Sequence, residues 1–163
     1  MTDVYSEEKR SQVMSRVHGK NTKPEICVRS ALHREGYRFR LHRVDLPGKP
    51  DIVLPLYHTV IFVNGCFWHQ HPGCRKATIP QNNRPFWKRK LTRTVQRDAQ
   101  NKADLLGLGW NVITIWECEM RNSMDATMRC VLKELKKAGR QNAERVKAGR
   151  SFKIQLKFRI YPY

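Results

Sequence analysis

The sequence is short of acidic residues and has no long apolar run. Its 163 residues contain 14 Asp and Glu against 32 Lys and Arg, which gives a formal net charge of +18. So basic a chain, with a pI near 10.2, is typical of proteins that bind a polyanion. No apolar run approaches the roughly 18 residues of a membrane span, and no segment is a clean basic amphipathic helix. Nucleic acid is therefore a better partner than lipid.

The cysteines also lack a pattern typical of disulfides. The N-terminal stretch MTDVYSEEKRSQ has no apolar signal-peptide core, so we expect a cytoplasmic protein whose thiols stay reduced. The cysteines are five in number, which is odd, and two of them lie close to histidines. This favours metal ligands and buried thiols. Cys27 and Cys130 each lie in the middle of an expected helix, and we interpret them as core residues.

Hydrophobic periodicity predicts one mixed α/β domain. Helices are expected at 6–17, 22–35, 84–106 and 123–137, and strands at 37–42, 51–54, 59–63 and 110–119. The pattern indicates a mixed sheet flanked by helices, with a single domain over 1–139. Residues 140–163 form a basic extension after Gly139. This extension is interpreted as a solvated tail, a phosphate-binding tail or, where SFKIQLKFRIY alternates, a further strand.

The stretch NGCFWHQHPGC carries two cysteines and two histidines directly after an expected strand. Four soft ligands are available here and at the end of the next expected strand: Cys66, His71, Cys74 and Cys118. Together they would complete a tetrahedral zinc site, and four protein ligands would make that zinc structural. The spacing leaves open whether His69 or His71 is the imidazole ligand. Buried thiols with incidental histidines are the alternative interpretation.

Asp51 is the candidate catalytic carboxylate. It lies in PGKPDIV, after a proline turn and at the start of a strand, where it can project toward the end of the adjoining strand. Pro-Asp in this setting resembles the PD-(D/E)xK nuclease core, in which the carboxylate binds Mg2+. The usual Glu-x-Lys half is missing, because those positions read Phe62-Val63-Asn64. Taken alone, Asp51 would be a turn or cap residue.

Several motifs taken together are more specific. PGKPDIV, FVNGCFWHQH, the downstream Cys74, FWKRK and WNVITIWEC closely resemble the very-short-patch repair (Vsr) DNA mismatch endonucleases, across residues 1–137. The resemblance implies a restriction-endonuclease-like fold with a structural zinc. It also implies Mg2+-dependent nicking 5′ to the thymine of a T·G mismatch left by deamination of 5-methylcytosine. The implied partner is double-stranded DNA with a T·G mismatch, and we expect a monomer without membrane contacts.

The resemblance assigns roles to individual residues. Asp51 would bind Mg2+ with help from the backbone carbonyl of Val63. His69 would act at the attacking water, which leaves His71 as the zinc ligand.

Two further positions match the family only in part. Asn64 stands where the best-known family member has a histidine, and an amide cannot carry a proton at neutral pH. Glu25 matches a family carboxylate that supports metal-bound water, but here it also completes a capping box with Thr22. The catalytic share of both side chains is therefore open.

Aromatic residues in and after the Cys/His stretch would contact the DNA. Phe67, Trp68 and Trp87 match family residues that insert into the base stack beside the mismatch. Met14 matches a residue that reaches the same step from the other groove. Unstacking costs least where pairing is already distorted, so such a wedge would give a mismatch preference. In an arbitrary protein, Phe67 and Trp68 would be interpreted as core residues.

Two other functions are open on the sequence alone. One is a restriction-type nuclease of the same fold with another target. The other is a non-catalytic, zinc-stabilised DNA-binding module in which Asp51 is only a cap. Mg2+-dependent nicking of a T·G duplex separates the three.

Overall fold

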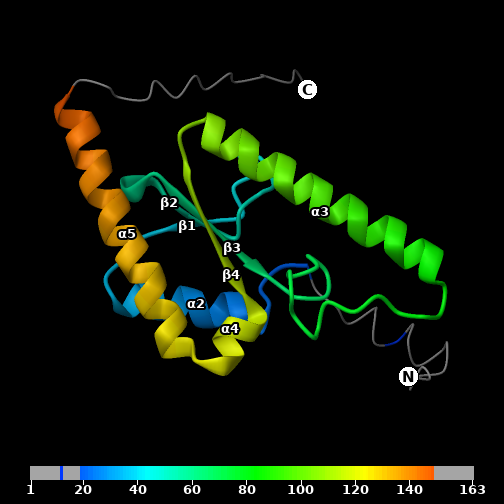
Figure 1. Ribbon diagram of the computed structural model, residues 1–163. Helices are drawn as coiled ribbons and strands as arrows, with labels where there is room; N and C mark the ends of the chain where they lie inside the picture. The colour runs from blue at the N-terminus through cyan, green and yellow to red at the C-terminus, as the bar shows by residue number, and fades with distance from the viewer. Residues whose placement is uncertain (1–11, 13–18, 149–163) are drawn as a thin grey trace, which may run out of the picture.

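Residues 19–148 form a four-stranded mixed sheet with helices on both faces (Figure 1). The computed structural model describes residue 12 and residues 19–148, and element labels follow Figure 1. In chain order the elements are α2 (Lys23–Arg34), β1 (Arg40–Leu41), β2 (Ile52–Leu54), the 3-10 turn η1 (Pro55–Tyr57), β3 (Thr59–Asn64), α3 (Arg84–Gly107), β4 (Asn111–Trp116), α4 (Glu117–Asn122) and α5 (Met124–Lys147). The mixed α/β architecture expected from the sequence is confirmed.

The strand directions place the C-terminal ends of β3 and β4 side by side. β1, β2 and β3 are antiparallel neighbours, whereas β3 and β4 run parallel, with Asn64 opposite Trp116. A parallel pair needs a crossover connection, and here that connection contains α3. The segments that follow β3 and β4 therefore start side by side.

The central strands are buried on both faces because alternate residues point to opposite sides. One face packs against α2 and α5 in a core that contains Ile52, Leu54, Ile61, Ile115, Val28, Leu32, Val131 and Leu135. The other face packs near the end of α3 in a core that contains Leu46, Val53, Val60, Leu105 and Trp110. Figure 1 shows α3 on the opposite side of the sheet from α2 and α5. Double coverage explains why β2 and β3 read as continuous apolar runs.

The start of α2 forms as its sequence predicts. The Thr22 side chain accepts from the Glu25 amide, and the Glu25 side chain bonds back to the cap, so the capping box is complete. Gly36, with φ of +82°, follows the end of the helix in a conformation that favours glycine. The expected span of this helix is confirmed.

Two expected strands are shorter than predicted. The strand at 37–42 reduces to Arg40–Leu41, because its partner β2 has three residues and His42, with φ of +45°, turns the chain away. Leu41 is exposed rather than buried. The strand at 110–119 ends at Trp116, and α4 begins at Glu117, so Cys118 lies in the first turn of a helix.

The closing helix is longer than predicted. Gly139 does not end α5, which continues to Lys147. A Cβ at position 139 would lie 3.1 Å from the ring of Tyr57, so the glycine permits a close approach to η1 instead of a stop. Apart from residue 12, which is helical, the helix expected at 6–17 lies outside the described residues, as does the strand-like segment 151–161. Within residues 19–148, no helix is long and apolar enough to cross a membrane.

Candidate active site and metal centre

Asp51 lies where the antiparallel pairing of β2 and β3 places it. It precedes β2, and because Ile52 is opposite Ile61, Asp51 comes beside the C-terminal part of β3. There the Val63 backbone N–H donates to Asp51 Oδ2 at 2.8 Å. The carboxylate predicted at the sheet edge is thus fixed through one oxygen by the strand that precedes the Cys/His stretch.

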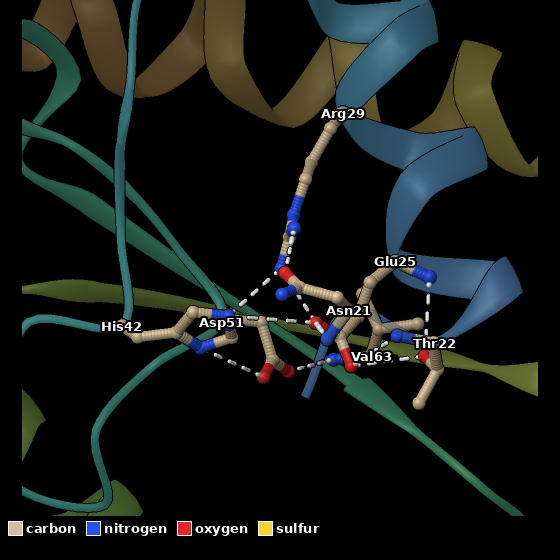
Figure 2. Close-up of polar contacts among 7 residues, drawn as sticks. All are labelled: Asn21, Thr22, Glu25, Arg29, His42, Asp51 and Val63. Atoms are coloured by element: carbon tan, nitrogen blue, oxygen red, sulfur yellow. Dashed lines mark hydrogen bonds and ion pairs between the residues drawn. The ribbon is translucent and has the colours of Figure 1, made fainter. Parts of the chain in front are cut away.

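Glu25 approaches from the first turn of α2 and is only 3% exposed. Its Oε1 accepts from the Thr22 hydroxyl at 2.9 Å, and its Oε2 accepts from Arg29 at 2.5 Å and from the Asn21 backbone N–H at 3.0 Å. The residue therefore caps the helix and also carries a neutralised buried charge. The Glu25 side chain lies close to Asp51, as Figure 2 shows.

His42 is a site residue that the sequence did not reveal. Its Nε2 lies 3.8 Å from Glu25 Oε2 and its Nδ1 lies 3.9 Å from Asp51 Oδ1 (Figure 2). One ligand atom from each of these three side chains lies within 4.8 Å of the others. We call Glu25, His42 and Asp51 the carboxylate corner. Two carboxylates and an imidazole form a donor set suited to a divalent cation.

The raised pKa of Asp51 indicates that a bound cation would stabilise the ionised carboxylate. Burial raises the pKa of Asp51; the Val63 amide opposes that rise, and the negative charge of Glu25 adds to it. His42 and Arg29 lower the same pKa by smaller amounts. A buried carboxylate with a raised pKa gains the most from a bound metal ion, because the ion removes the cost of its ionised form.

The Cys/His stretch forms a second cluster. Four ligand atoms lie within 4.8 Å of one another: those of Cys66, His71, Cys74 and Cys118. His71 Nδ1 is 3.2 Å from Cys118 Sγ and 3.8 Å from Cys66 Sγ, and a sulfur and a nitrogen on one tetrahedral zinc lie about 3.6 Å apart. The cluster contains His71 and not His69, which favours His71 as the imidazole ligand. Its residues could hold zinc.

The cluster joins the two parallel strand ends. Cys66, His71 and Cys74 come from the segment after β3, and Cys118 comes from α4 directly after β4. The His71 ring also stacks on Trp116, with centroids 4.1 Å apart. Burial raises the pKa of the Cys66 thiol to about 11, so a metal ion must displace its proton to bind there.

His69 points to a different partner. Its Nδ1 lies 2.5 Å from Asp98 Oδ2, on α3. Asp98 is a second site residue that the sequence did not reveal, although it is one of two acidic residues in that basic helix. The carboxylate can only accept, so Nδ1–H donates to it, and Nε2 is the ring nitrogen that this contact does not use.

Three aromatic rings gather beside the Cys/His cluster. Phe67 lies 5.0 Å from Trp68 and 5.5 Å from Trp87 between ring centroids, and all three are half-buried. Neither of the two core clusters among residues 19–148 includes them. Lys90 Nζ lies 5.3 Å from the centre of the Trp68 ring. The rings form a partly exposed cluster between the segment after β3 and the start of α3, and they are not part of the hydrophobic core.

Other candidate residues lie apart from these clusters. Asn64 is the last residue of β3, next to Val63, and is half-buried. Met14 lies outside the described residues. The interpretation of Cys27 and Cys130 as core residues is wrong: both are exposed, because the buried faces of α2 and α5 are formed by other positions.

Comparison with known proteins gives consistent matches. A family described as DNA mismatch endonuclease Vsr matches residues 2–76. The type II nicking enzyme V.XorIIP of Xanthomonas oryzae pv. oryzae is 47% identical over 134 residues, which are 81% of this chain and 98% of that protein. V.NmeAIP of Neisseria meningitidis serogroup A, also a type II nicking enzyme, is 47% identical over 75% of this chain and 86% of its own. The DNA mismatch endonuclease Vsr of Escherichia coli is 36% identical over 83% of this chain and 86% of its own.

Proposed function

The chain belongs to the family of the DNA mismatch endonuclease Vsr and is a DNA endonuclease, and on this basis we propose that it nicks one strand 5′ to the thymine of a T·G mismatch. Hydrolysis of the phosphodiester would depend on Mg2+ at Asp51, and zinc would fill the Cys/His cluster. The fold would be restriction-endonuclease-like. The observation that supports this most is the carboxylate corner, where a buried Asp51 is held by the Val63 amide.

Each residue has a task that follows from its contacts. Asp51 would hold the ion, Glu25 would support the water bound to it, and the Val63 amide orients Asp51. When bound, Mg2+ supplies a Lewis acid that offsets the charge on the scissile phosphate. His69 would take a proton from the attacking water through Nε2, since Asp98 holds Nδ1 and acts as a positioning residue. Asn64 can only donate or accept hydrogen bonds there.

The direct test uses one labelled duplex in two forms. A T·G duplex and the matched T·A duplex are incubated with the protein and Mg2+, and the position of the nick is read on a sequencing gel. Nicking 5′ to the mismatched thymine, and little nicking of T·A, is the expected result. No nicking of either duplex by folded, zinc-loaded protein would refute the proposal.

A second candidate is nicking at a target that is not a T·G mismatch. Two relatives with higher identity than the E. coli mismatch endonuclease are named type II nicking enzymes, at 47% against 36%. Equal nicking of T·G and T·A duplexes at one sequence would favour this alternative.

The DNA surface is proposed to run along α3. Seven exposed basic residues lie on this helix: Arg84, Lys88, Arg89, Lys90, Arg93, Arg97 and Lys102. The helix begins at the aromatic cluster and carries Asp98, the partner of His69. Phosphates held along α3 would therefore position the duplex over the site.

We expect this surface to govern the salt dependence of binding. Replacing Lys88 and Arg93 with Gln should lower the slope of log affinity against log salt by up to about 0.9 for each phosphate that the variant no longer neutralises. Titrations on matched duplex between low and moderate salt measure this. Lys133 and Lys137, exposed on α5 across the sheet, provide the matched control pair, whose replacement should leave the slope unchanged. Equal effects of both pairs would contradict a surface on α3.

The aromatic cluster should control mismatch preference. Replacing Phe67 and Trp68 with Ala removes stacking worth roughly 1 to 3 kcal/mol per ring, so T·G binding should weaken about tenfold or more. Binding to matched duplex, which rests on phosphate contacts, should stay nearly unchanged. Parallel titrations with T·G and T·A duplexes make the comparison.

Protein stability separates a wedge from a core. Removal of the ring pairs in the double variant should cost about 1 to 2 kcal/mol. Trp110→Ala is the control for a buried ring, 6% exposed, and should cost about 3 to 5 kcal/mol. A double variant as unstable as Trp110→Ala, or one that loses affinity for both duplexes equally, would end the wedge hypothesis.

A further inference from the structure

His42 has no task in the mechanism above, yet it lies inside the carboxylate corner. It comes from the turn after β1, whereas Glu25 comes from α2 and Asp51 precedes β2. The imidazole is 18% exposed and faces a carboxylate with each ring nitrogen (Figure 2). Three separate elements bring these side chains together, so the position of the imidazole is set by the fold.

The separation of His42 and Asp51 suits two ligands of one ion. Nδ1 and Oδ1 are 3.9 Å apart, and two atoms each bound about 2.1 Å from a common ion lie roughly 3 to 4.2 Å apart. Asp51 Oδ2 accepts from the Val63 amide, so Oδ1 is the oxygen directed to the imidazole. A cation shared by Oδ1 and Nδ1 would require little movement of either side chain.

Arg29 defines the state of the imidazole before a metal binds. Its guanidinium lies 3.0 Å from His42 Nε2 and can only donate, so Nε2 carries no proton and Nδ1 does. A ligand role for Nδ1 would require the ring proton to be on Nε2, which lies 3.8 Å from Glu25 Oε2. Arg29 would then leave His42. The order carboxylate, imidazole, metal is a common arrangement in metal sites.

We propose that His42 is a ligand of the catalytic divalent ion and that it gives the site a preference for a first-row transition ion over Mg2+. The inference rests on the proposed function in placing the ion at Asp51. Mg2+ favours oxygen ligands and retains its waters, whereas imidazole is a good ligand for first-row transition ions. Mn2+ is a suitable probe, because it takes both oxygen and nitrogen but does not favour a thiolate-rich site such as the Cys/His cluster.

The test measures Mn2+ binding to the zinc-loaded full chain by electron paramagnetic resonance of the free ion, with Mg2+ as competitor. Wild type should bind Mn2+ at least about tenfold more tightly than Mg2+, and its pulsed spectrum should show coupling to an imidazole 14N nucleus. His42→Gln should lose that coupling and bind Mn2+ about 10 to 100 times more weakly. Asp51→Asn, which removes the other ligand, should abolish binding at this site.

Two controls exclude general damage. His33→Gln changes an exposed histidine on α2 and should keep both the coupling and the affinity. His42→Asn is a second variant with a smaller side chain, and thermal melting shows whether each variant is folded. Nitrogen coupling retained in a folded His42→Gln or His42→Asn variant, or equal wild-type affinity for Mn2+ and Mg2+, would overturn the proposal.

Failure of this inference is distinguishable from failure of the proposed function. Nicking of the T·G duplex by wild type, without 14N coupling to bound Mn2+, would reject His42 as a ligand and leave the nuclease in place. Coupling that depends on His42, in a protein that nicks no duplex, would support the ligand and reject the nuclease.

Discussion

Asp51→Asn should reduce Mg2+-dependent nicking of the T·G duplex by at least about a thousandfold, a loss of roughly 4 kcal/mol in transition-state stabilisation. The amide can still accept from Val63 N–H, so the local structure should remain, but the charge proposed to hold the ion is removed. Duplex binding, which rests on basic residues elsewhere, should survive. Single-turnover nicking and a gel-shift titration on the same preparation measure both quantities.

Asp45→Asn is the matched control for this variant. Asp45 lies in the loop that leads to Asp51, is exposed and pairs with Arg43, and its replacement should leave nicking unchanged. Appreciable nicking by Asp51→Asn would remove Asp51 from the mechanism.

Asp51→Asn should not destabilise the metal-free protein. The folded pKa of Asp51 is raised by burial, so the unfolded chain ionises first as pH rises. Stability falls between the unfolded and folded pKa values and does not return at higher pH. At neutral pH, therefore, Asn removes an unfavourable buried charge, and thermal melting without Mg2+ should give an equal or higher midpoint. A markedly lower midpoint would show that the fall in activity reflects damage to the structure.

Cys118→Ser should have the largest effect on stability. A structural zinc contributes on the order of 10 kcal/mol to the folded state, and loss of one of four ligands removes much of that. We expect one zinc per wild-type chain by elemental analysis, and a large fall in both zinc content and melting temperature in the variant.

Cys130→Ser is the control within the same sequence. This thiol is exposed on α5 and is not part of the Cys/His cluster, so its replacement should change neither zinc content nor melting temperature. A folded, active wild type without zinc, or equal effects of the two variants, would contradict a structural zinc.

The sequence predicts the parts of the site that follow from strand pairing. Asp51 meets β3 because a short hairpin fixes which residues face each other, and Cys118 meets Cys66 because parallel strands end at one edge. Both relations can be inferred once the apolar runs are interpreted as strands. The capping box similarly indicates both the start of α2 and the position of Glu25.

The remaining site residues depend on tertiary geometry that no local pattern carries. His42 enters the carboxylate corner because the chain turns there with a positive φ, and Asp98 meets His69 because one face of α3 crosses the segment after β3. Gly139 has the sequence pattern of a helix stop, although here the glycine allows a close approach to Tyr57. A position in the middle of a helix does not show which helical face is covered, and this is why the prediction for Cys27 and Cys130 is wrong.

The Val63 amide orients Asp51, and Cys66 belongs to the Cys/His cluster. Only Asn64 and Gly65 lie between these two residues in the chain. Val63 and Asn64 pair with Ile115 and Trp116 of β4, the strand that leads into Cys118. Zinc in the Cys/His cluster would therefore hold together the two strand ends on which the position of the Val63 amide depends.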